Sequence, residues 1–155
     1  IWIMNLSLDF KVNLHEYCVL LVQDKLNVLK QQIAARKQDL ESASKSSAGD
    51  KHETSRAMIH LEQEKLGLQF IEVEKQSHLL AQIAIKEHVN FQSGTLIYTP
   101  KALFYIAVGL GKITFKNNEV YVISPISPLA QAFLNSKSLE NVSFQTSNYS
   151  ILSIV

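Results

Sequence analysis

The sequence has few of the residues that interrupt regular structure or cross-link a chain. It contains one cysteine, three prolines and five glycines among 155 residues. The single cysteine, Cys18, excludes an internal disulfide framework and fits a reducing compartment, so we expect a cytoplasmic protein. The five histidines are scattered and, with one cysteine, offer none of the paired spacings of a zinc site.

Long apolar runs and an excess of one charge are also absent. No run approaches the roughly 20 residues that span a bilayer, so we expect no membrane contact. The opening residues 1–4 lack the basic leader of a signal peptide, and we expect Met4 to be the natural start. With 15 basic and 14 acidic residues, the net charge of +1 argues against a protein that holds nucleic acid by neutralising phosphates.

The distribution of charged residues and prolines divides the chain near residue 90. Charged residues are dense before this point, whereas all three prolines lie after it. We therefore predict an α+β protein with two domains. Residues 1–90 would form an N-terminal antiparallel two-helix coiled coil with its tip at about 43–53. Residues 91–155 would form a small antiparallel sheet domain with one short helix.

The N-terminal half carries the repeat of a coiled coil. Residues 14–40 contain neither glycine nor proline, and apolar positions from Val22 to Leu40 follow steps of four and three, with a similar stripe upstream at Leu14, Cys18 and Leu21. These positions are Leu14, Cys18, Leu21, Val22, Leu26, Leu29, Ile33 and Leu40, with Arg36 filling the gap. We interpret Cys18 as a packing residue on a buried seam, because nothing nearby supplies the electropositive setting of a reactive thiol.

A serine-rich break over 41–49 precedes a second predicted helix over 50–88. Its apolar stripe is predicted to run through Met58, Leu61, Leu68, Ile71, Leu79 and Ile83. A short turn between two helices forces an antiparallel pair.

The C-terminal half reads as strands and turns. Segments rich in β-branched and aromatic residues predict strands over 94–99, 102–108, 112–115, 120–123, 142–144 and 149–154. Ser127-Pro128 predicts the N-cap and first residue of a short helix that continues over 129–134. Gly109-Leu110-Gly111 lacks the third glycine and the lysine of a phosphate-binding loop, so we interpret it as a hairpin turn.

Two acids, Asp50 and Glu53, stand three residues apart at the predicted start of the second helix. They fit a capping box, in which they satisfy the helix end. They also fit a carboxylate pair that completes a Mg²⁺ site held by another active site. The cations Lys45, Lys51, His52 and Arg56 stand beside them. These cations would either offset the acids or steer nucleic acid.

At this point the sequence resembles a known family. Gly49-Asp50-x-x-Glu53, opening the second helix of a hairpin, resembles the tip of the bacterial Gre transcript cleavage factors. The segment from Ile123 to Leu134 is similar to the "S-P-[IL]-A-x-A-L" segment of that family, and the strands at 142–144 and 149–151 resemble its last strands. The resemblance spans nearly the whole chain and includes the order of its two halves.

The resemblance implies a function as a transcription elongation factor. The C-terminal domain would have an FKBP-like fold and dock on bacterial RNA polymerase, and the coiled coil would enter its secondary channel. Asp50 and Glu53 would then hold a Mg²⁺ jointly with polymerase and help a backtracked enzyme to cut its RNA near the 3′ end. The chain would be a monomer with no turnover and no tightly bound cofactor of its own. Candidate partner contacts are Ser124, Pro125, Ser127 and Pro128.

Three alternatives stay open at the level of sequence. Thr54-Ser55-Arg56 follows the tip glutamate where the family has an asparagine, so the chain could instead occupy the channel without promoting cleavage. A chaperone-like or oligomerising coiled coil would self-associate through the stripe over residues 22–40. A prolyl isomerase would need an aromatic-lined apolar pocket in the C-terminal half.

Overall fold

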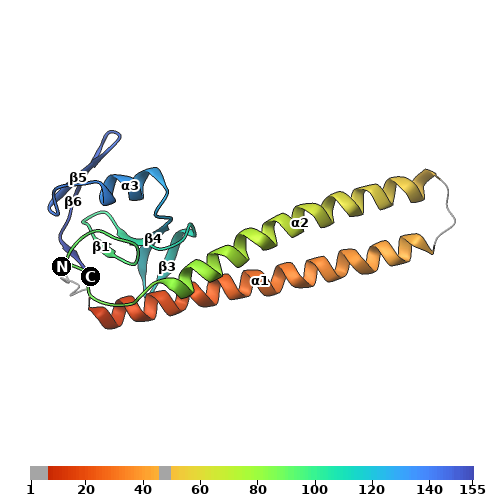
Figure 1. Cartoon of the computed structure of the whole chain (residues 1–155), viewed down its shortest axis with the longest axis horizontal. Coiled ribbons are helices and arrows are strands. Elements are labelled where there is room, and N and C mark those ends of the chain that lie inside the picture. Colours follow the sequence, from red (N-terminus) through yellow and green to blue (C-terminus); the bar gives the residue numbers. More distant parts are fainter. Residues whose placement is uncertain (1–6, 46–49) are drawn as a thin grey trace. The chain divides into compact units, whose positions relative to one another are not determined.

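The computed structural model describes residues 7–45 and 50–155, without the side chains of residues 50–52. Its helices are α1 (Leu8–Ser44), α2 (Asp50–Gln82) and α3 (Pro128–Leu134). Its strands are β1 (Leu96–Tyr98), β2 (Leu103–Ile106), β3 (Gly111–Phe115), β4 (Asn118–Ile123), β5 (Asn141–Phe144), β6 (Ser147–Ser150) and β7 (Ser153–Ile154) (Figure 1). Two long helices, a small sheet and one short helix confirm the predicted α+β class.

The chain forms two compact units. The helical unit comprises residues 19–78, and the sheet unit comprises Ile1–Cys18 together with Leu79–Val155. Both long helices therefore contribute residues to both units. This division does not coincide with the predicted boundary at residue 90, because the start of α1 and the end of α2 pack with residues of the sheet unit.

The predicted stripe of α1 is buried from Val22 to Leu29 and half-buried beyond. Val22, Leu26 and Leu29 are at most 8% exposed, and Ile33 and Leu40 are half-buried. The steps of four and three keep these side chains on one side of the helix, where they face α2. The coiled-coil interpretation of α1 is therefore confirmed.

The predicted stripe of α2 is wrong. Met58, Leu61, Leu68 and Ile71 are 60–67% exposed, so they do not form the seam. The seam consists instead of buried and half-buried positions at regular steps of four and three. They are Ile59, Gln63, Leu66, Phe70, Val73, Ser77 and Leu80. The seam contains polar Gln63 and Ser77 while the outer face is apolar, which is why hydrophobicity alone selects the wrong side.

The sheet of the sheet unit is mixed rather than antiparallel as predicted. Its strand order is β3-β4-β2-β1-β7, and β2 pairs with β4 in parallel while the other pairs are antiparallel. The segment Gly109–Leu110 joins β2 to β3, which are not neighbours, so the hairpin turn predicted there is also wrong. The tight turn lies instead between β3 and β4, where Lys116 and Asn117 have φ of 47° and 63°, as a type I′ turn requires.

The predicted final strand over 149–154 is divided in two. Strand β6 pairs with β5 in a separate two-stranded sheet, and β7 pairs with β1 at the edge of the main sheet. Between them the backbone N–H of Ile151 donates to Glu140 O, whereas that of Leu152 donates to Tyr98 O. The chain thus changes its pairing partner within two residues.

The central strand β2 is buried on both faces. Phe104 points toward α3 and packs with Phe133 and Tyr121, with ring centroids 5.6 and 5.5 Å apart. Its neighbour Tyr105 points the other way, because successive side chains of a strand alternate. Its Oη lies 2.7 Å from Nδ1 of His15 on α1. The start of α1 and α3 therefore cover opposite faces of the sheet.

A buried lysine connects three distant segments of the sheet unit. The Lys11 ammonium donates to Lys86 O at 2.7 Å and to Val155 O at 2.8 Å, and it lies 3.4 Å from Nδ1 of His88. Burial lowers the pKa of Lys11 to about 8. The helix α2 was predicted to continue to His88 but ends at Gln82. The chain leaves the helix there and brings the Lys86 carbonyl and the His88 ring to Lys11.

We predict that the Lys11 cluster makes stability depend on pH. Because the folded-state pKa of Lys11 is lowered, the unfolded chain binds more protons above pH 8, and stability rises with pH. Lys11 should contribute a rise of about 1 kcal/mol to the free energy of unfolding between about pH 8 and 9, measured as the difference from Lys11→Met, because the raised pKa of Cys18 acts in the opposite direction in both proteins. The Lys11→Met variant should lose this rise, which chemical denaturation at each pH would measure. Equal slopes for the two proteins would contradict the prediction.

We also predict which face of α2 stabilises the helical unit. Leu66 is 7% exposed and Met58 is 66% exposed. Leu66→Ala should lower the free energy of unfolding by about 2–4 kcal/mol. Met58→Ala should change it by less than about 0.5 kcal/mol. Urea denaturation followed by circular dichroism would compare them, and a larger loss for Met58→Ala would refute the seam described above.

Candidate functional site

The first candidate site lies where α1 ends and α2 begins. Helix α1 ends at Ser44 and α2 begins at Asp50. Residues 46–49 lie outside the described residues, as do the side chains of Asp50, Lys51 and His52. The predicted capping role of Asp50 is thus outside the description. Glu53 is described, and its side chain is exposed on the first turn of α2.

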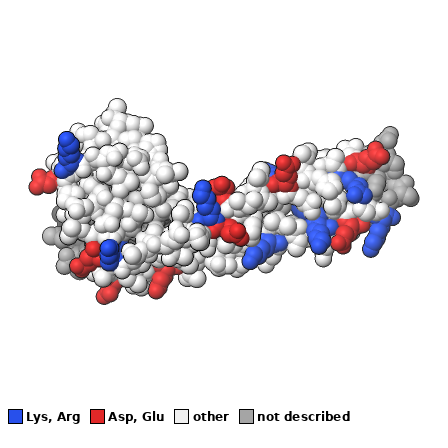
Figure 2. All heavy atoms as spheres, in the orientation of Figure 1, with Lys and Arg blue, Asp and Glu red and all other residues white. Residues whose placement is uncertain are grey.

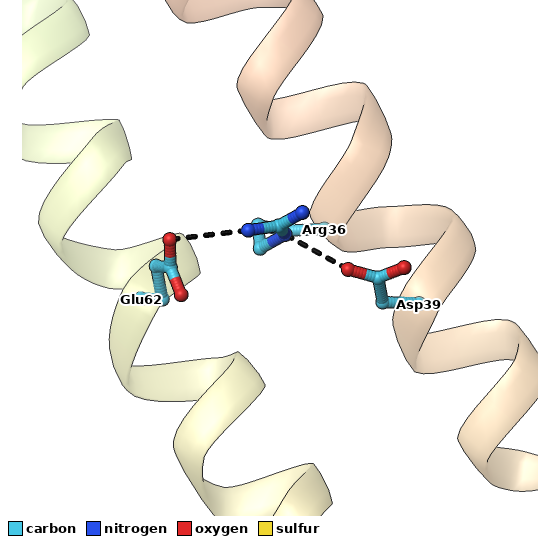
Figure 3. Close-up of polar contacts among 3 residues, drawn as sticks. All are labelled: Arg36, Asp39 and Glu62. Atoms are coloured by element: carbon cyan, nitrogen blue, oxygen red, sulfur yellow. Dashed lines mark hydrogen bonds and ion pairs between the residues drawn. The ribbon is translucent and has the colours of Figure 1, made fainter.

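Two polar contacts fix the antiparallel alignment of the helices toward this end. Arg36 Nη1 on α1 lies 3.2 Å from Glu62 Oε1 on α2, and Figure 3 shows the guanidinium between Glu62 and Asp39. Arg36 Nε lies 2.9 Å from Asp39 Oδ2 as an ion pair, without the alignment of a hydrogen bond. Nearer the end, Arg56 Nη1 donates to Ser44 Oγ at 2.9 Å. The contacting residues are 26 and then 12 positions apart, as expected on approaching the turn of a hairpin.

The cations near the acids do not all share one role. Arg56 is half-buried and bound to Ser44, whose hydroxyl in turn donates to Leu40 O at 2.9 Å. Arg56 therefore ties the two helices together. Lys45 is exposed, while the other two predicted cations, Lys51 and His52, lie outside the described side chains. Figure 2 shows cationic and anionic side chains intermixed along the long helices, with no region of one sign on the face shown.

The acids could contribute ligands but could not hold a metal ion strongly. Carboxylate oxygens are the ligands that Mg²⁺ prefers, and this ion is usually bound by one or two carboxylates together with waters and substrate oxygens. Asp50 and Glu53 are three residues apart in the first turn of α2, where the helix dipole also favours negative charge. Among the residues whose side chains the structure describes, 7–45 and 53–155, no group of three or more potential ligand side chains is assembled. The chemistry of the pair therefore suits a metal that another macromolecule already holds.

The second candidate segment, Ser124 to Pro128, is organised around the start of α3. Ser127 is the N-cap, accepting from Ala130 N, and Pro128 is the first helical residue, as predicted. The Ser127 hydroxyl donates to Ser124 O at 2.7 Å, and Gln131 Nε2 donates to Pro125 O at 2.7 Å. These bonds hold the turn rigidly.

A third feature was not predicted from the sequence. An apolar groove of about 730 Å³ lies in the helical unit between α1 and α2. Its lining residues are Leu21, Asp24, Lys25, Val28, Leu29, Leu68, Gln69, Glu72 and Val73. The signal for it was the apolar outer face of α2, which sequence analysis assigned to the seam.

The buried polar groups of the sheet unit form a structural network. Cys18 is fully buried, and burial raises the pKa of its thiol to about 12, so it is a packing residue as predicted. Burial also lowers the pKa of His15 and raises that of Tyr105, which are hydrogen-bonded to each other. Neutral forms are thus favoured for all three groups. An activated nucleophile would need the opposite shift for the thiol.

We predict that Arg56 secures the last turn of α1. Replacing it by methionine removes the bond to Ser44 Oγ but keeps the length of the side chain. Amide hydrogen exchange at residues 41–45 should become about 3- to 10-fold faster, as expected for the loss of one exposed hydrogen bond. Exchange at Leu26 and Leu29, in the distant seam, should not change. Equal acceleration throughout α1 would indicate general unfolding and contradict this local role.

Comparisons with known proteins give no additional assignment. No protein-family model, no curated protein and no solved structure matches this chain. The residues described contain no helix with the length and apolar character needed to cross a membrane. The Gre resemblance and the FKBP-like architecture that it implies stay predictions.

Proposed function

We propose that this protein is a Gre-like transcription elongation factor that binds bacterial RNA polymerase at its secondary channel. The helical hairpin would enter the channel, and the sheet unit would dock outside it. Asp50 and Glu53 would reach the catalytic Mg²⁺ of a backtracked polymerase and stimulate cleavage of its transcript. The observation that carries the proposal is the exposed Glu53, one turn into α2 at the end of an antiparallel helical pair.

The dimensions of the helical unit support this role. Residues 19–44 of α1 belong to this unit, and at 1.5 Å per residue they extend for about 40 Å. The polar contacts Arg36–Glu62 and Arg56–Ser44 keep both helices aligned up to the turn. A narrow, aligned pair can deliver a side chain into a confined space without bringing a bulky domain with it.

The chemistry of the tip also supports it. Polymerase would hold the first metal ion and the RNA, and the two acids would supply oxygen ligands for a second Mg²⁺. In a two-metal arrangement such ligands help to orient the water that attacks the phosphodiester. The chain itself would bind no phosphate, in agreement with its near-neutral charge. It would therefore be a donor of ligands to another enzyme and have no turnover alone.

The direct test uses backtracked elongation complexes with Mg²⁺. We expect the wild-type protein to shorten the transcripts, and Asp50→Ala and Glu53→Ala each to reduce the cleavage rate by at least about tenfold while still binding polymerase. Glu41→Ala is a matched control, since Glu41 is an exposed acid near the end of α1. That variant should cleave at the wild-type rate.

The same experiment separates the alternatives. Binding without any cleavage by the wild-type protein would favour a regulator that only occupies the channel. Absence of binding to polymerase would refute the proposed function altogether. Binding can be measured by fluorescence anisotropy with a dye on a cysteine introduced in the sheet unit, because Cys18 is fully buried.

A further inference from the structure

The outer face of α2 is apolar although the hairpin seam is complete without it. Leu61, Leu68 and Ile71 are 67%, 61% and 60% exposed. At about 100° per residue these three side chains point away from the buried Leu66, and Leu68 also borders the groove between the helices. A row of large exposed apolar side chains on one helix face is typical of an interaction surface.

This face has a coiled-coil repeat of its own. Leu61, Glu64, Leu68, Ile71 and Lys75 follow steps of three and four, and we call them the outer stripe. Along the helix, Glu64 precedes the apolar centre formed by Leu68 and Ile71, and Lys75 follows it. Lys65 and Glu72 flank the stripe along the same edge. All seven residues lie in the helical unit, and none of the side chains is buried.

We propose that a second copy of this chain covers the outer stripe. The two α2 helices would pack antiparallel around a two-fold axis between positions 69 and 70. In this register Leu68 faces Ile71 of the second copy, and Glu64 faces its Lys75. On the flanking edge Lys65 faces Glu72 of the second copy. Because a two-fold interface is made of the same patch twice, each of these pairs occurs twice.

The charge pattern identifies a second copy as the occupant. The same two-fold axis brings together the apolar pair Leu68–Ile71 and the oppositely charged pairs Glu64–Lys75 and Lys65–Glu72. A surface that is complementary to itself requires this arrangement. Sliding the helices by one heptad in one direction brings Lys65 opposite Lys65, and in the other direction brings Glu72 opposite Glu72. Like charges at flanking positions disfavour those registers, as they do in natural coiled coils. The outermost layers, in which Leu61 faces His78, limit the apolar contact to the centre.

This association differs from the self-association considered from sequence. The stripe over residues 22–40 is not available for it, since Val22, Leu26 and Leu29 are buried against α2. In place of the expected monomer, the free protein would be a dimer in which α2 is covered. The inference does not rest on the proposed function, because it uses only the outer face of α2. If both hold, dissociation of the dimer precedes entry of the hairpin into any channel.

The first test measures the oligomeric state of the full chain by sedimentation equilibrium. Between about 5 and 200 µM, we expect the wild type to approach twice the monomer mass. Leu68→Lys should raise the dissociation constant at least about tenfold, because it places two cations beside the axis. Its helix content by circular dichroism should not change, since Leu68 is exposed in the chain. A wild type that stays monomeric over this range would overturn the proposal.

A charge exchange tests the register. Lys65→Glu and Glu72→Lys should each weaken the dimer about tenfold, because each converts two attractive pairs into repulsive ones. The double variant Lys65→Glu/Glu72→Lys restores both pairs and should return to near the wild-type dissociation constant. Residues 65 and 72 are two turns apart on one helix, so effects within a single chain would not be rescued.

A matched control is Glu74→Lys, a reversal at an exposed position of α2 outside the stripe, which should leave the dissociation constant unchanged. A double variant no stronger than the single variants would overturn the proposed register. An effect of Glu74→Lys on the dissociation constant as large as that of Lys65→Glu or Glu72→Lys would also overturn it.

Discussion

Burial of one narrow seam is the constraint on which the long helices depend. Two helices without a third layer can each bury only a single stripe, and here the stripes have the 3.5-residue period that keeps them facing each other. Val22, Leu26 and Leu29 supply it on α1, and Leu66 and Phe70 supply it on α2. Toward the turn, the polar contacts Arg36–Glu62 and Arg56–Ser44 add to half-buried apolar residues and keep the ends of the two helices opposite each other. The position of Glu53 follows from this alignment.

The helices and strands could be predicted from the sequence more completely than the faces that they bury. The helices follow from long stretches without glycine or proline, and the strands from β-branched and aromatic segments. The seam of α1 was correct because its apolar residues have no competing stripe. The seam of α2 was wrong because both of its faces carry apolar residues, and the buried face also contains polar Gln63 and Ser77. Only contact with α1 decides between the two faces, and a single helix sequence does not contain that contact.

The sheet and the candidate site were limited in the same way by long-range partners. Strand pairing such as that of β2 with β4 depends on where the β3–β4 hairpin folds back, which no local pattern encodes. Lys11 was an ordinary charged residue in the sequence, yet it is fully buried and donates to two backbone carbonyls from distant segments. The acids of the tip were found through a family resemblance and through their spacing. The bond from Arg56 to Ser44 could not have been predicted, because it needs the second helix in place.

The contact between Lys11 and Val155 also orders the folding of the chain in time. These residues are 144 positions apart, so the bond closes a loop of almost the whole sequence. Contacts of such separation are slow to form, and during synthesis this one must wait until Val155 has left the ribosome. The helical pair has no such requirement, since its polar contacts join residues only 26 and 12 positions apart. A nascent chain would therefore form the helical pair before the sheet is complete, because β1 lacks its neighbour β7 until residues 153–154 have been synthesised.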